Sequence, residues 1–346
     1  MKNLLTCILV LSCLVASRTH ASSGWTFGLY VDAGYIDSNN KPENKTWRSK
    51  GTTSSIDRIE LNMVRAFGRK DATADSRWGL EFGLQAGIDA DALRTAAPPP
   101  AEEPVERADD LRHLSTTTVS YLIDAGNGLV VTGGLMGSYI GYESYFSKDN
   151  PNYTRGYLSD YVPYYLWGAQ ASYPLNDRLT LGAVVTTGFN YLTNPNNTPS
   201  FGALMVWDAS PTLTVKQNLY YGPDQSDTSL EYWRFFSDSI VEWRNGRFLV
   251  AGAFDFGFEK QAWIDGTPYY NWMSGAIWGR VDLNDAWRIA VRPEFFSDPD
   301  GLMTEARQEI WAITATAEYH PSFLKYNNIS ARFEYRYDKS TRLDGG

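Results

Sequence analysis

The feature that most constrains the fold of this chain is a strict alternation of apolar and polar residues, which begins at Gly24. In "GWTFGLYVDAGYID", Trp25 and its alternate neighbours are apolar, and the residues between them are mostly small or polar. In "SRWGLEFGLQAGID", the same alternation places Glu81 and Gln85 on one side of a strand, whereas a helix would scatter them around its surface. The period of two therefore predicts β-strands and an all-β protein.

This alternation recurs along the chain in about fifteen segments of roughly ten residues each. The thirteenth segment contains Pro293, which cannot donate a backbone hydrogen bond and so indicates a bulge. The fourteenth, "QEIWAITATAEY", is also compatible with a helix that continues from the preceding "LMTEARQ". The predicted strands lie near 24–36, 55–66, 77–89, 114–124, 127–137, 164–173, 178–191, 200–208, 212–222, 232–244, 247–258, 270–283, 286–297, 308–319 and 328–338.

The connections between these strands alternate in length. Short turns such as "AGNG", "PLND" and "WRNGRF" follow the even strands, and "NG" is a strong hairpin signal. Long polar segments follow the odd strands, among them a proline-rich acidic insertion at 90–112. The strand pattern resumes unchanged after that insertion, so we interpret it as a loop and not as a linker between domains. Short turns at one end and long loops at the other are typical of an outer-membrane barrel.

Aromatic residues mark both ends of the apolar face. Ten residues at about 3.3 Å each, tilted by roughly 40°, rise about 25 Å, which is the height of the apolar band between two aromatic girdles. Tryptophan and tyrosine favour the membrane interface because they combine an apolar body with a polar tip. The predicted girdle residues, in matching parity, are Trp25, Tyr35, Trp233, Trp243, Phe248, Phe258, Trp287, Trp311 and Tyr319.

The opposite face carries charges in the middle of the strands, as in "NISARFEYRYD". In the core of a soluble sandwich these ionised groups would each cost several kcal/mol without partners, and fifteen such strands would make an implausibly large sandwich. A water-filled lumen accommodates the charges easily. The predicted pore-lining charges are Arg58, Glu60, Arg77, Glu81, Lys216, Arg234, Asp238, Glu242, Asp255, Arg288, Arg292, Glu294, Arg332, Glu334 and Arg336.

These patterns together predict a transmembrane antiparallel up-and-down β-barrel that forms a single domain over residues 22–346. Bacterial single-chain barrels normally have an even number of strands, so about 16 are expected. Either the last one is missing after residue 338, which the absence of a final alternating segment favours, or one strand is miscounted. Acidic and basic residues are interleaved on the lumen face, which predicts only mild ion selectivity.

The first 21 residues, "MKNLLTCILVLSCLVASRTHA", have the order of a secretory signal peptide: a lysine, an apolar core and a small residue at Ala21. The apolar run is shorter than the roughly 20 residues of a membrane span, and a lipoprotein cut before Cys13 is a weaker alternative. Cys7 and Cys13 are the only cysteines. Without this leader the chain has 29 basic and 40 acidic residues, a net charge of −11, which argues against a nucleic-acid partner.

Several segments carry a family resemblance: "GLMGSYIGYESY", "NYTRGYL", "RPEFFSDPDG" and "FEYRYDKS". In this order they resemble the putative β-barrel porin-2 (OmpL-like) outer-membrane porin family. The resemblance implies a channel in the outer membrane of a Gram-negative bacterium through which small hydrophilic solutes or ions diffuse passively. The chain departs from the family by its proline-rich acidic loop and by lacking the usual closing strand.

The longest structured connection is "SYIGYESYFSKDNPNYTRGYLSDYVP", residues 138–163, which is rich in tyrosine. A sixteen-stranded barrel leaves a channel wide enough to need narrowing, and an inward loop narrows it. We predict that this segment forms the constriction or a lid, with a cap on the outer rim as the alternative. The residues predicted to act there are Tyr142, Glu143, Tyr145, Arg155, Tyr157, Asp160 and Tyr161.

Two other functions are compatible with the sequence. One is a plugged barrel with a structural or adhesin-like role. The other is an outer-membrane lipid hydrolase, for which His113 and Ser115 lie two residues apart, on the lipid side by parity with Val119. The residues around "HLSTTT" supply no oxyanion donor, and no metal-ligand or phosphate-loop spacing occurs. We therefore predict no catalytic residues, no metal and no cofactor. The predicted partners are outer-membrane lipid and, in a homo-oligomer, further copies of the chain.

Overall fold

The computed structural model describes residues 6–20, 24–93, 108–189, 191–192, 196–262, 264–321 and 329–341, and side chains are described from residue 24 onward. The chain forms sixteen strands and a few short helical turns. The strands are β1 (Thr6–His20), β2 (Trp25–Ser38), β3 (Ile59–Lys70), β4 (Trp78–Ala86), β5 (Thr117–Ile123), β6 (Leu129–Gly137), β7 (Tyr165–Asn176), β8 (Leu179–Thr186), β9 (Ser200–Ser210), β10 (Leu213–Pro223), β11 (Trp233–Asn245), β12 (Phe248–Lys260), β13 (Tyr269–Asp282), β14 (Trp287–Asp298), β15 (Gln308–Tyr319) and β16 (Ile329–Ser340). The helical turns are α1 (Ile88–Asp91), η1 (Ala108–His113), η2 (Ser147–Asp149), α2 (Tyr157–Asp160) and η3 (Leu230–Tyr232).

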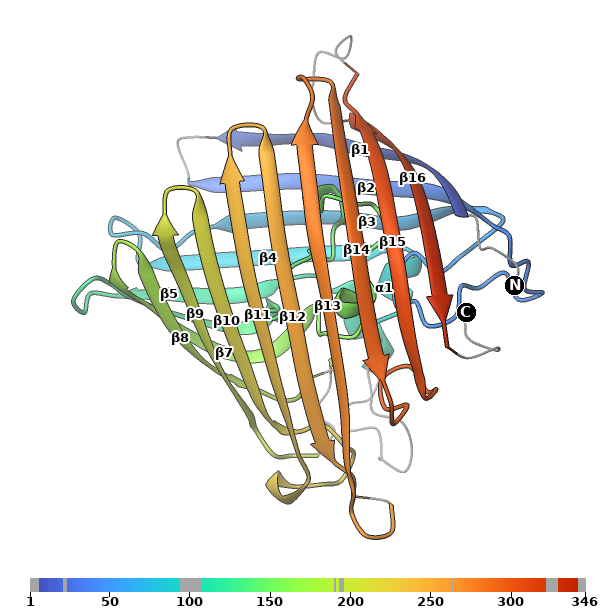
Figure 1. Cartoon of the computed structure of the whole chain (residues 1–346). Helices are drawn as coiled ribbons and strands as arrows, with labels where there is room; N and C mark the ends of the chain where they lie inside the picture. The colour runs from blue at the N-terminus through green and yellow to red at the C-terminus, as the bar shows by residue number, and fades with distance from the viewer. Residues whose placement is uncertain are drawn as a thin grey trace.

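All strands belong to one sheet in which each strand pairs antiparallel with its sequence neighbours, and the sheet closes into a barrel. Figure 1 shows this ring of tilted strands, with α1 seen between them. The fifteen strands β2–β16 correspond one by one to the fifteen predicted segments. The largest differences are the end of β8, at Thr186 and not near residue 191, and the start of β3, at Ile59 and not near residue 55. The predicted all-β up-and-down architecture is confirmed.

The ring is completed by Thr6–His20, whose backbone pairs with β16 on one side and β2 on the other. The sequence pattern predicted about sixteen strands with about fifteen visible, and those fifteen are β2–β16. The inference that a closing strand is missing after residue 338 stays a prediction. The edges of β2 and β16 present unpaired backbone donors and acceptors, which any extended segment can satisfy. The assignment of residues 1–21 as an export signal stays a prediction. Removal of those residues would leave β2–β16, and another extended segment would then have to close the ring between β2 and β16.

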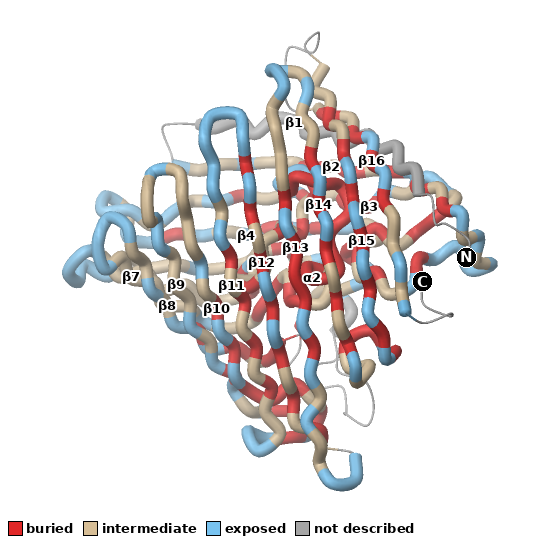
Figure 2. Tube along the Cα trace, in the orientation of Figure 1, coloured by how far each residue is buried: buried red, intermediate tan, exposed pale blue. Residues whose placement is uncertain are grey.

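The two faces of the sheet differ as the alternation predicts. On β12, Phe254 is 47 % exposed on the outer face, whereas the next residue, Asp255, is 1 % exposed on the inner face. Figure 2 shows the same alternation of buried and exposed residues along β12–β15. The fourteenth predicted segment is strand β15 and not a helix. Among the described residues, no helix is long and apolar enough to cross a membrane.

Two local irregularities matter for the lumen. The β2–β3 register shifts between Asp32 and Ala33, and the extra residue on β3 leaves both Asn62 and Met63 buried. This bulge reverses the parity of β3 beyond it. At Pro293 the expected bulge does not occur, because the β14–β15 register runs through it without a shift. Toward β13 the register is also kept, and only the pairs beside the proline are lost, since proline has no N–H to donate.

The long connections gather at one end of the barrel and the short turns at the other. The core of the protein lies inside the ring. Its largest apolar cluster joins Tyr157, from the connection 138–163, to wall residues such as Phe236, Trp272 and Phe296. A second cluster joins Tyr145 of the same connection to Tyr30 and Met63. The connection 138–163 enters the barrel, and its side chains pack against the inner wall to form part of the apolar core.

Candidate functional site in the barrel lumen

The connection 138–163, here called the inward loop, folds into the lumen. Its base is closed by the Ser138 N–H, which donates to the Tyr164 carbonyl at 3.0 Å. Tyr153 and Arg155 near its tip are 0 % exposed. Loops normally run over the surface because their backbone polar groups need water. The inward loop instead finds its hydrogen-bond partners on the barrel wall.

Wall side chains bind the backbone of the loop tip directly. The Glu334 carboxylate on β16 accepts the Tyr153 N–H at 2.6 Å and the Thr154 N–H at 3.0 Å. Arg332, two residues earlier, donates to the carbonyl of Ser147 at 2.6 Å. Arg336 donates to the Arg155 carbonyl at 3.0 Å. Because charged groups hold main-chain atoms, the position of the tip depends on its backbone conformation more than on its side chains.

A chain of buried ion pairs connects the loop to β14 and β16. Glu143 of the loop pairs with Arg292 at 2.6 Å, and it also accepts the Trp278 indole N–H at 3.1 Å. Arg292 contacts Glu294 at 3.2 Å, and Glu294 pairs with Arg336 at 2.9 Å. Removing one member of such a buried network leaves an uncompensated charge. This side of the lumen is therefore sealed by charged groups that neutralise one another.

A second buried ion pair joins the loop to α1. Arg155 pairs with Asp89 at 2.8 Å, with both side chains 0 % exposed. Arg155 also donates to Thr53 at 2.9 Å and to the Tyr145 carbonyl. Burial raises the pKa of the Asp89 carboxyl, and the Arg155 guanidinium acts in the opposite direction. The arginine therefore offsets part of the cost of an ionised carboxylate inside the barrel.

The tyrosines of the loop act as hydrogen-bond donors. Burial raises the pKa of the Tyr145, Tyr153 and Tyr157 phenols well above the ordinary value, so each keeps its proton. A neutral phenol can donate to a carboxylate or carbonyl. Several tyrosines of the loop donate in this way. Tyr142 donates to Glu242 (2.7 Å), Tyr145 to the Asp89 carbonyl, Tyr153 to Asp32 (3.1 Å), Tyr157 to Asp338 (3.3 Å) and Tyr161 to the Ser49 carbonyl (3.0 Å).

All seven residues predicted for the constriction thus lie in or at the mouth of the lumen. The charged ones, Glu143, Arg155 and Asp160, are each paired with an oppositely charged group and buried. The charged side chains of the loop therefore point at the wall and at other loops. The side chains that face the remaining passage are mostly those of the wall.

The predicted pore-lining charges fall into three groups. Arg58 and Arg77 are exposed in connections outside the strands, and their predicted places on strands were wrong because the alternation extends past the true strand ends. The second group lies on the lumen face and is partly or fully exposed; its members are Glu60, Glu81, Lys216, Glu242 and Arg288. Buried on the lumen face, mostly against the inward loop, are Arg234, Asp238, Asp255, Arg292, Glu294, Arg332, Glu334 and Arg336.

Four important residues were not predicted from the sequence. Arg65 contacts Glu81 at 2.9 Å in the lumen, but the bulge in β3 changes its parity. Asp32 has lumen parity on β2 and was recognisable by the same rule as the other charges. Lys50 comes from a connection, where no periodic pattern exists to place it. Asp89 ends the predicted strand 77–89 with the parity of Glu81 and Gln85, but β4 ends at Ala86 and Asp89 lies in α1.

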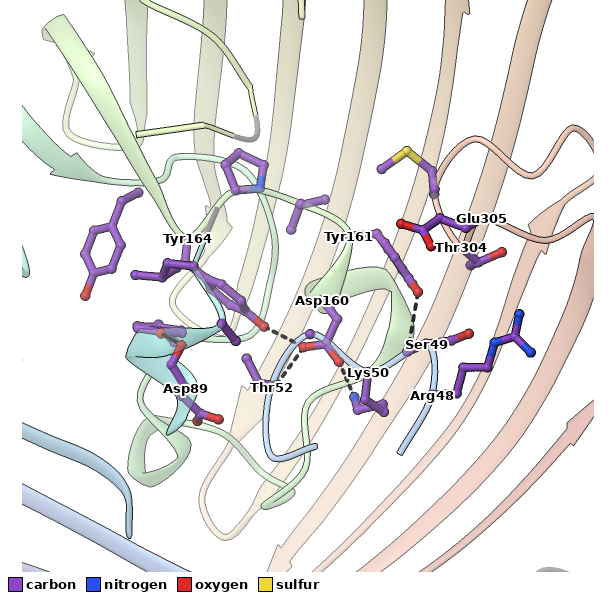
Figure 3. A pocket seen from close by; sticks show the side chains of 18 of the residues that line it. Arg48, Ser49, Lys50, Thr52, Asp89, Asp160, Tyr161, Tyr164, Thr304 and Glu305 are labelled. Atoms are coloured by element: carbon purple, nitrogen blue, oxygen red, sulfur yellow. Dashed lines mark hydrogen bonds and ion pairs between the residues drawn. The ribbon is translucent and has the colours of Figure 1, made fainter. Parts of the chain in front are cut away.

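Space remains on both sides of the inward loop. A cavity of about 260 Å³ at the long-connection end is lined by Arg48, Asp160, Tyr161, Tyr164 and Glu305, among others (Figure 3). A cavity of about 530 Å³ lies toward the short-turn end and is lined from β3–β7, including Arg69, Glu81, Thr118, Thr132 and Gln170. The larger space therefore lies against the β3–β7 wall, opposite the ion-paired β14–β16 wall.

One pair of buried acids differs from the others. Asp238 and Asp255 are cross-strand neighbours on β11 and β12, 0 % and 1 % exposed. One oxygen of Asp238 accepts the Gly141 N–H at 2.7 Å and the Asn218 amide at 2.8 Å. The Oδ1 atoms of both aspartates have no hydrogen-bond partner, and in the described part of the chain neither carboxylate has an ion pair.

Replacing Asp255 by asparagine is expected to stabilise the barrel by about 1 kcal/mol or more, because an amide donor would replace a facing like charge. The midpoint of urea unfolding at pH 8 measures this change. Glu259→Gln is the matched control on the same strand. It weakens a buried ion pair with Arg234 at 2.6 Å, so it should lower the midpoint. A lower midpoint for Asp255→Asn would contradict repulsion between the carboxylates of Asp238 and Asp255.

The residues of the hydrolase alternative do not form a catalytic pair. Ser115 is buried and accepts the Arg65 guanidinium at 2.9 Å on the lumen side, so its predicted place on the lipid side was wrong. The cause is that β5 begins only at Thr117, so strand parity does not extend to Ser115. His113 is exposed at the end of η1. No group of three or more metal-ligating side chains occurs among the described residues.

The predicted girdle residues all lie on the outer face of the sheet. Trp311 is 57 % exposed and Phe248 46 %, and none of the nine is buried. Near the long-connection ends of β11–β13, Trp233 packs against Phe258 and Tyr269 with ring centroids 5.1 and 5.8 Å apart. At the opposite end, Trp287 and Tyr319 are 4.7 Å apart. The aromatic residues thus form bands at both ends of the outer face.

Comparison with known proteins agrees with this architecture. The outer-membrane channel DcaP of Acinetobacter baumannii is similar in fold, with a TM-score of 0.50, 9% identity, and coverage of 94% of this chain and 100% of that one. The anion-selective porin from Comamonas acidovorans has a TM-score of 0.47 at 10% identity, covering 97% and 98% of the two chains. No curated protein sequence matches. The family model described as "Putative beta-barrel porin-2, OmpL-like" matches residues 24–345. The chain therefore belongs to the putative beta-barrel porin-2, OmpL-like family of porins.

Proposed function

We propose that this porin forms a water-filled outer-membrane channel through which small hydrophilic solutes diffuse passively, and that the inward loop narrows the channel. The observation that carries the proposal is the division of the sheet into an apolar outer face and a charged inner face. The inward charges either face the lumen or form ion pairs and hydrogen bonds with the inward loop, whereas hydrocarbon on the outer face would offer neither water nor partners. By this account the long connections lie outside the cell and the short turns in the periplasm.

We propose that the passage runs along the β3–β7 wall. The inward loop is held on β14–β16 by buried ion pairs, and the larger cavity lies on the other side. Arg69 on β3 and Glu81 on β4 are cross-strand neighbours that line that cavity, and the hydroxyls of Thr118 on β5 and Thr132 on β6 continue the lining. A mixed polar lining of this kind favours small polar solutes over any one charge type.

The alternative of a plugged barrel with a structural role is favoured by the deep burial of the loop tip. Liposome swelling with sugars of increasing size distinguishes the two functions. An open channel gives fast swelling with small sugars and a sharp size limit. No swelling with the smallest sugar, from correctly folded and inserted protein, would support the plug and contradict the channel.

The lining of the passage predicts an effect on ion selectivity. Glu81→Gln removes an acidic side chain from the larger cavity and leaves Arg65 without its carboxylate partner. The ratio of cation to anion permeability, measured as a reversal potential in a salt gradient, should fall on the order of twofold. Glu231→Gln is the control, because Glu231 is exposed on η3 outside the lumen. An equal shift in both variants would argue against a passage beside Glu81.

Export and assembly complete the proposal. The family match begins at residue 24, which supports cleavage of residues 1–21 as a signal. The barrel wall is short at β5. The seven residues of this strand span only about 18 Å along the barrel axis, less than the height of the apolar band, roughly 25 Å. A second copy packed on this side would cover the short wall, where Trp78 and Leu84 are strongly exposed. Chemical cross-linking in native outer membranes tests for the oligomer. We propose no enzymatic activity.

A further inference from the structure

Residues 45–57, within the connection from β2 to β3, reach into the mouth of the barrel and contact the inward loop. Lys50 forms an ion pair with Asp160, and both side chains are 0 % exposed. Lys50 also donates to the Arg155 carbonyl at 2.6 Å. On the same side, the Tyr161 hydroxyl donates to the Ser49 carbonyl at 3.0 Å. Figure 3 shows Lys50, Thr52 and Ser49 facing Asp160 and Tyr161.

Asp160 is the centre of these contacts. Besides the ammonium of Lys50, its carboxylate accepts the Thr52 hydroxyl at 2.6 Å and the Tyr164 hydroxyl at 3.1 Å. Two of these donors come from the first long connection and one from the base of the inward loop. The carboxylate therefore ties together two segments that are more than a hundred residues apart in the sequence.

The backbone of residues 45–57 is strained. Lys45, Ser49, Thr53 and Asp57 all have a positive φ, between 52° and 61°. This region is costly for residues other than glycine, and most of all for the β-branched Thr53. Thr53 is held there from two sides, because its N–H donates to Asp89 at 2.6 Å and its hydroxyl accepts Arg155 at 2.9 Å. Such a conformation persists only where surrounding contacts fix it.

Burial also makes the charged form of Lys50 less favourable. Desolvation lowers the pKa of its ammonium, Asp160 acts in the opposite direction, and the nearby Arg336 adds to the lowering. Asp160 therefore offsets part of the effect by which burial disfavours the charged lysine. Loss of either partner would leave the other buried without its charge partner, in contact with the inward loop.

We propose that residues 45–57 form a clasp that holds the inward loop in place, with Lys50 and Asp160 as its positioning residues. The inference rests on the proposed channel function, because it concerns how steadily the passage is kept open. Wall residues of β14 and β16 hold the tip of the loop and the backbone as far as Tyr157, and the clasp adds contacts at Arg155, Asp160 and Tyr161 on its returning half. Without the clasp the barrel still forms, but the returning half of the loop fluctuates.

The test uses Lys50→Met, Asp160→Asn and the double variant in the full-length chain. Single-channel recordings in planar bilayers should show more open-channel noise and more frequent brief closures in each single variant, by about tenfold in closing rate. The double variant should be no worse than the worse single one, because the two residues act through one contact. Lys41→Met is the control, since Lys41 pairs with Asp57 in the same connection but is exposed.

A second measurement does not depend on current. Amide hydrogen exchange of residues 154–161 in detergent should accelerate at least about tenfold in Lys50→Met and stay unchanged in Lys41→Met. Exchange and closing rates equal to those of the wild type would overturn the clasp, as would additive effects in the double variant. A wild-type chain that carries no current contradicts the channel function alone, and the exchange measurement then still decides the clasp.

Discussion

Deleting residues 146–156 is expected to raise the single-channel conductance on the order of threefold, because a sixteen-stranded barrel without an inward loop leaves a wide channel. The deletion removes the loop tip, including Tyr153 and Arg155, which are 0 % exposed. It also frees Arg332, Glu334 and Arg336 on β16 to line the water-filled lumen. A short Gly-Ser linker joins the ends, and conductance is measured in planar bilayers at about 1 M salt, where surface charges are screened over about 3 Å.

The control for this deletion is a variant that lacks residues 264–266, the exposed tip of the β12–β13 connection. It shortens a long connection without touching the lumen, so its conductance should equal that of the wild type. If the variant lacking 146–156 also keeps the wild-type value, the inward loop does not narrow the passage.

Arg155→Met is expected to destabilise the packed lumen by about 3–5 kcal/mol, the usual cost of leaving one member of a buried ion pair alone. The substitution leaves the Asp89 carboxylate buried without its 2.8 Å partner, and it removes the donor to Thr53. The midpoint of urea unfolding, followed by tryptophan fluorescence in detergent, measures the change. Because two loops and α1 meet at Arg155, the effect should be among the largest of any single substitution.

The matched control is Arg77→Met, which removes an ion pair of the same length, 2.8 Å, between exposed side chains. Exposed pairs contribute less than about 1 kcal/mol, so its midpoint should barely move. Similar losses for both variants would mean that burial of the Arg155–Asp89 pair has no special importance.

The wall of the barrel was predictable because a strand has a fixed period. Residues of β2 illustrate this, since Tyr30 and Asp32 point inward and Phe27 outward, as parity requires. The prediction fails where the period is interrupted. The bulge at Asn62 and Met63 turns Arg65 inward against simple counting, and Ser115 lies before the true start of β5. A bulge leaves little trace in one sequence, because both of its residues are ordinary side chains.

The contacts of the loops were not predictable in the same way. The richness of the segment 138–163 in tyrosine indicated an ordered loop, and the structure brings it into the lumen. Its partners Lys50, Thr53 and Asp89 come from other connections, and no periodicity relates their positions to those of Asp160 or Arg155. Contacts between residues about a hundred positions apart depend on how the strands close into a barrel, so they can be identified only from the three-dimensional structure.

The most direct test of the account is quenching of single tryptophans by lipids that carry bromine on their acyl chains. The account requires Trp287 and Trp311, on the outer face, to contact lipid, and Trp278, which is 0 % exposed inside the barrel, to be shielded from it. Variants that each retain one of these tryptophans are reconstituted into brominated vesicles. Strong quenching of Trp287 and Trp311 with none for Trp278 is the expected result. Equal quenching of all three, or none, would contradict a barrel whose apolar face meets the hydrocarbon.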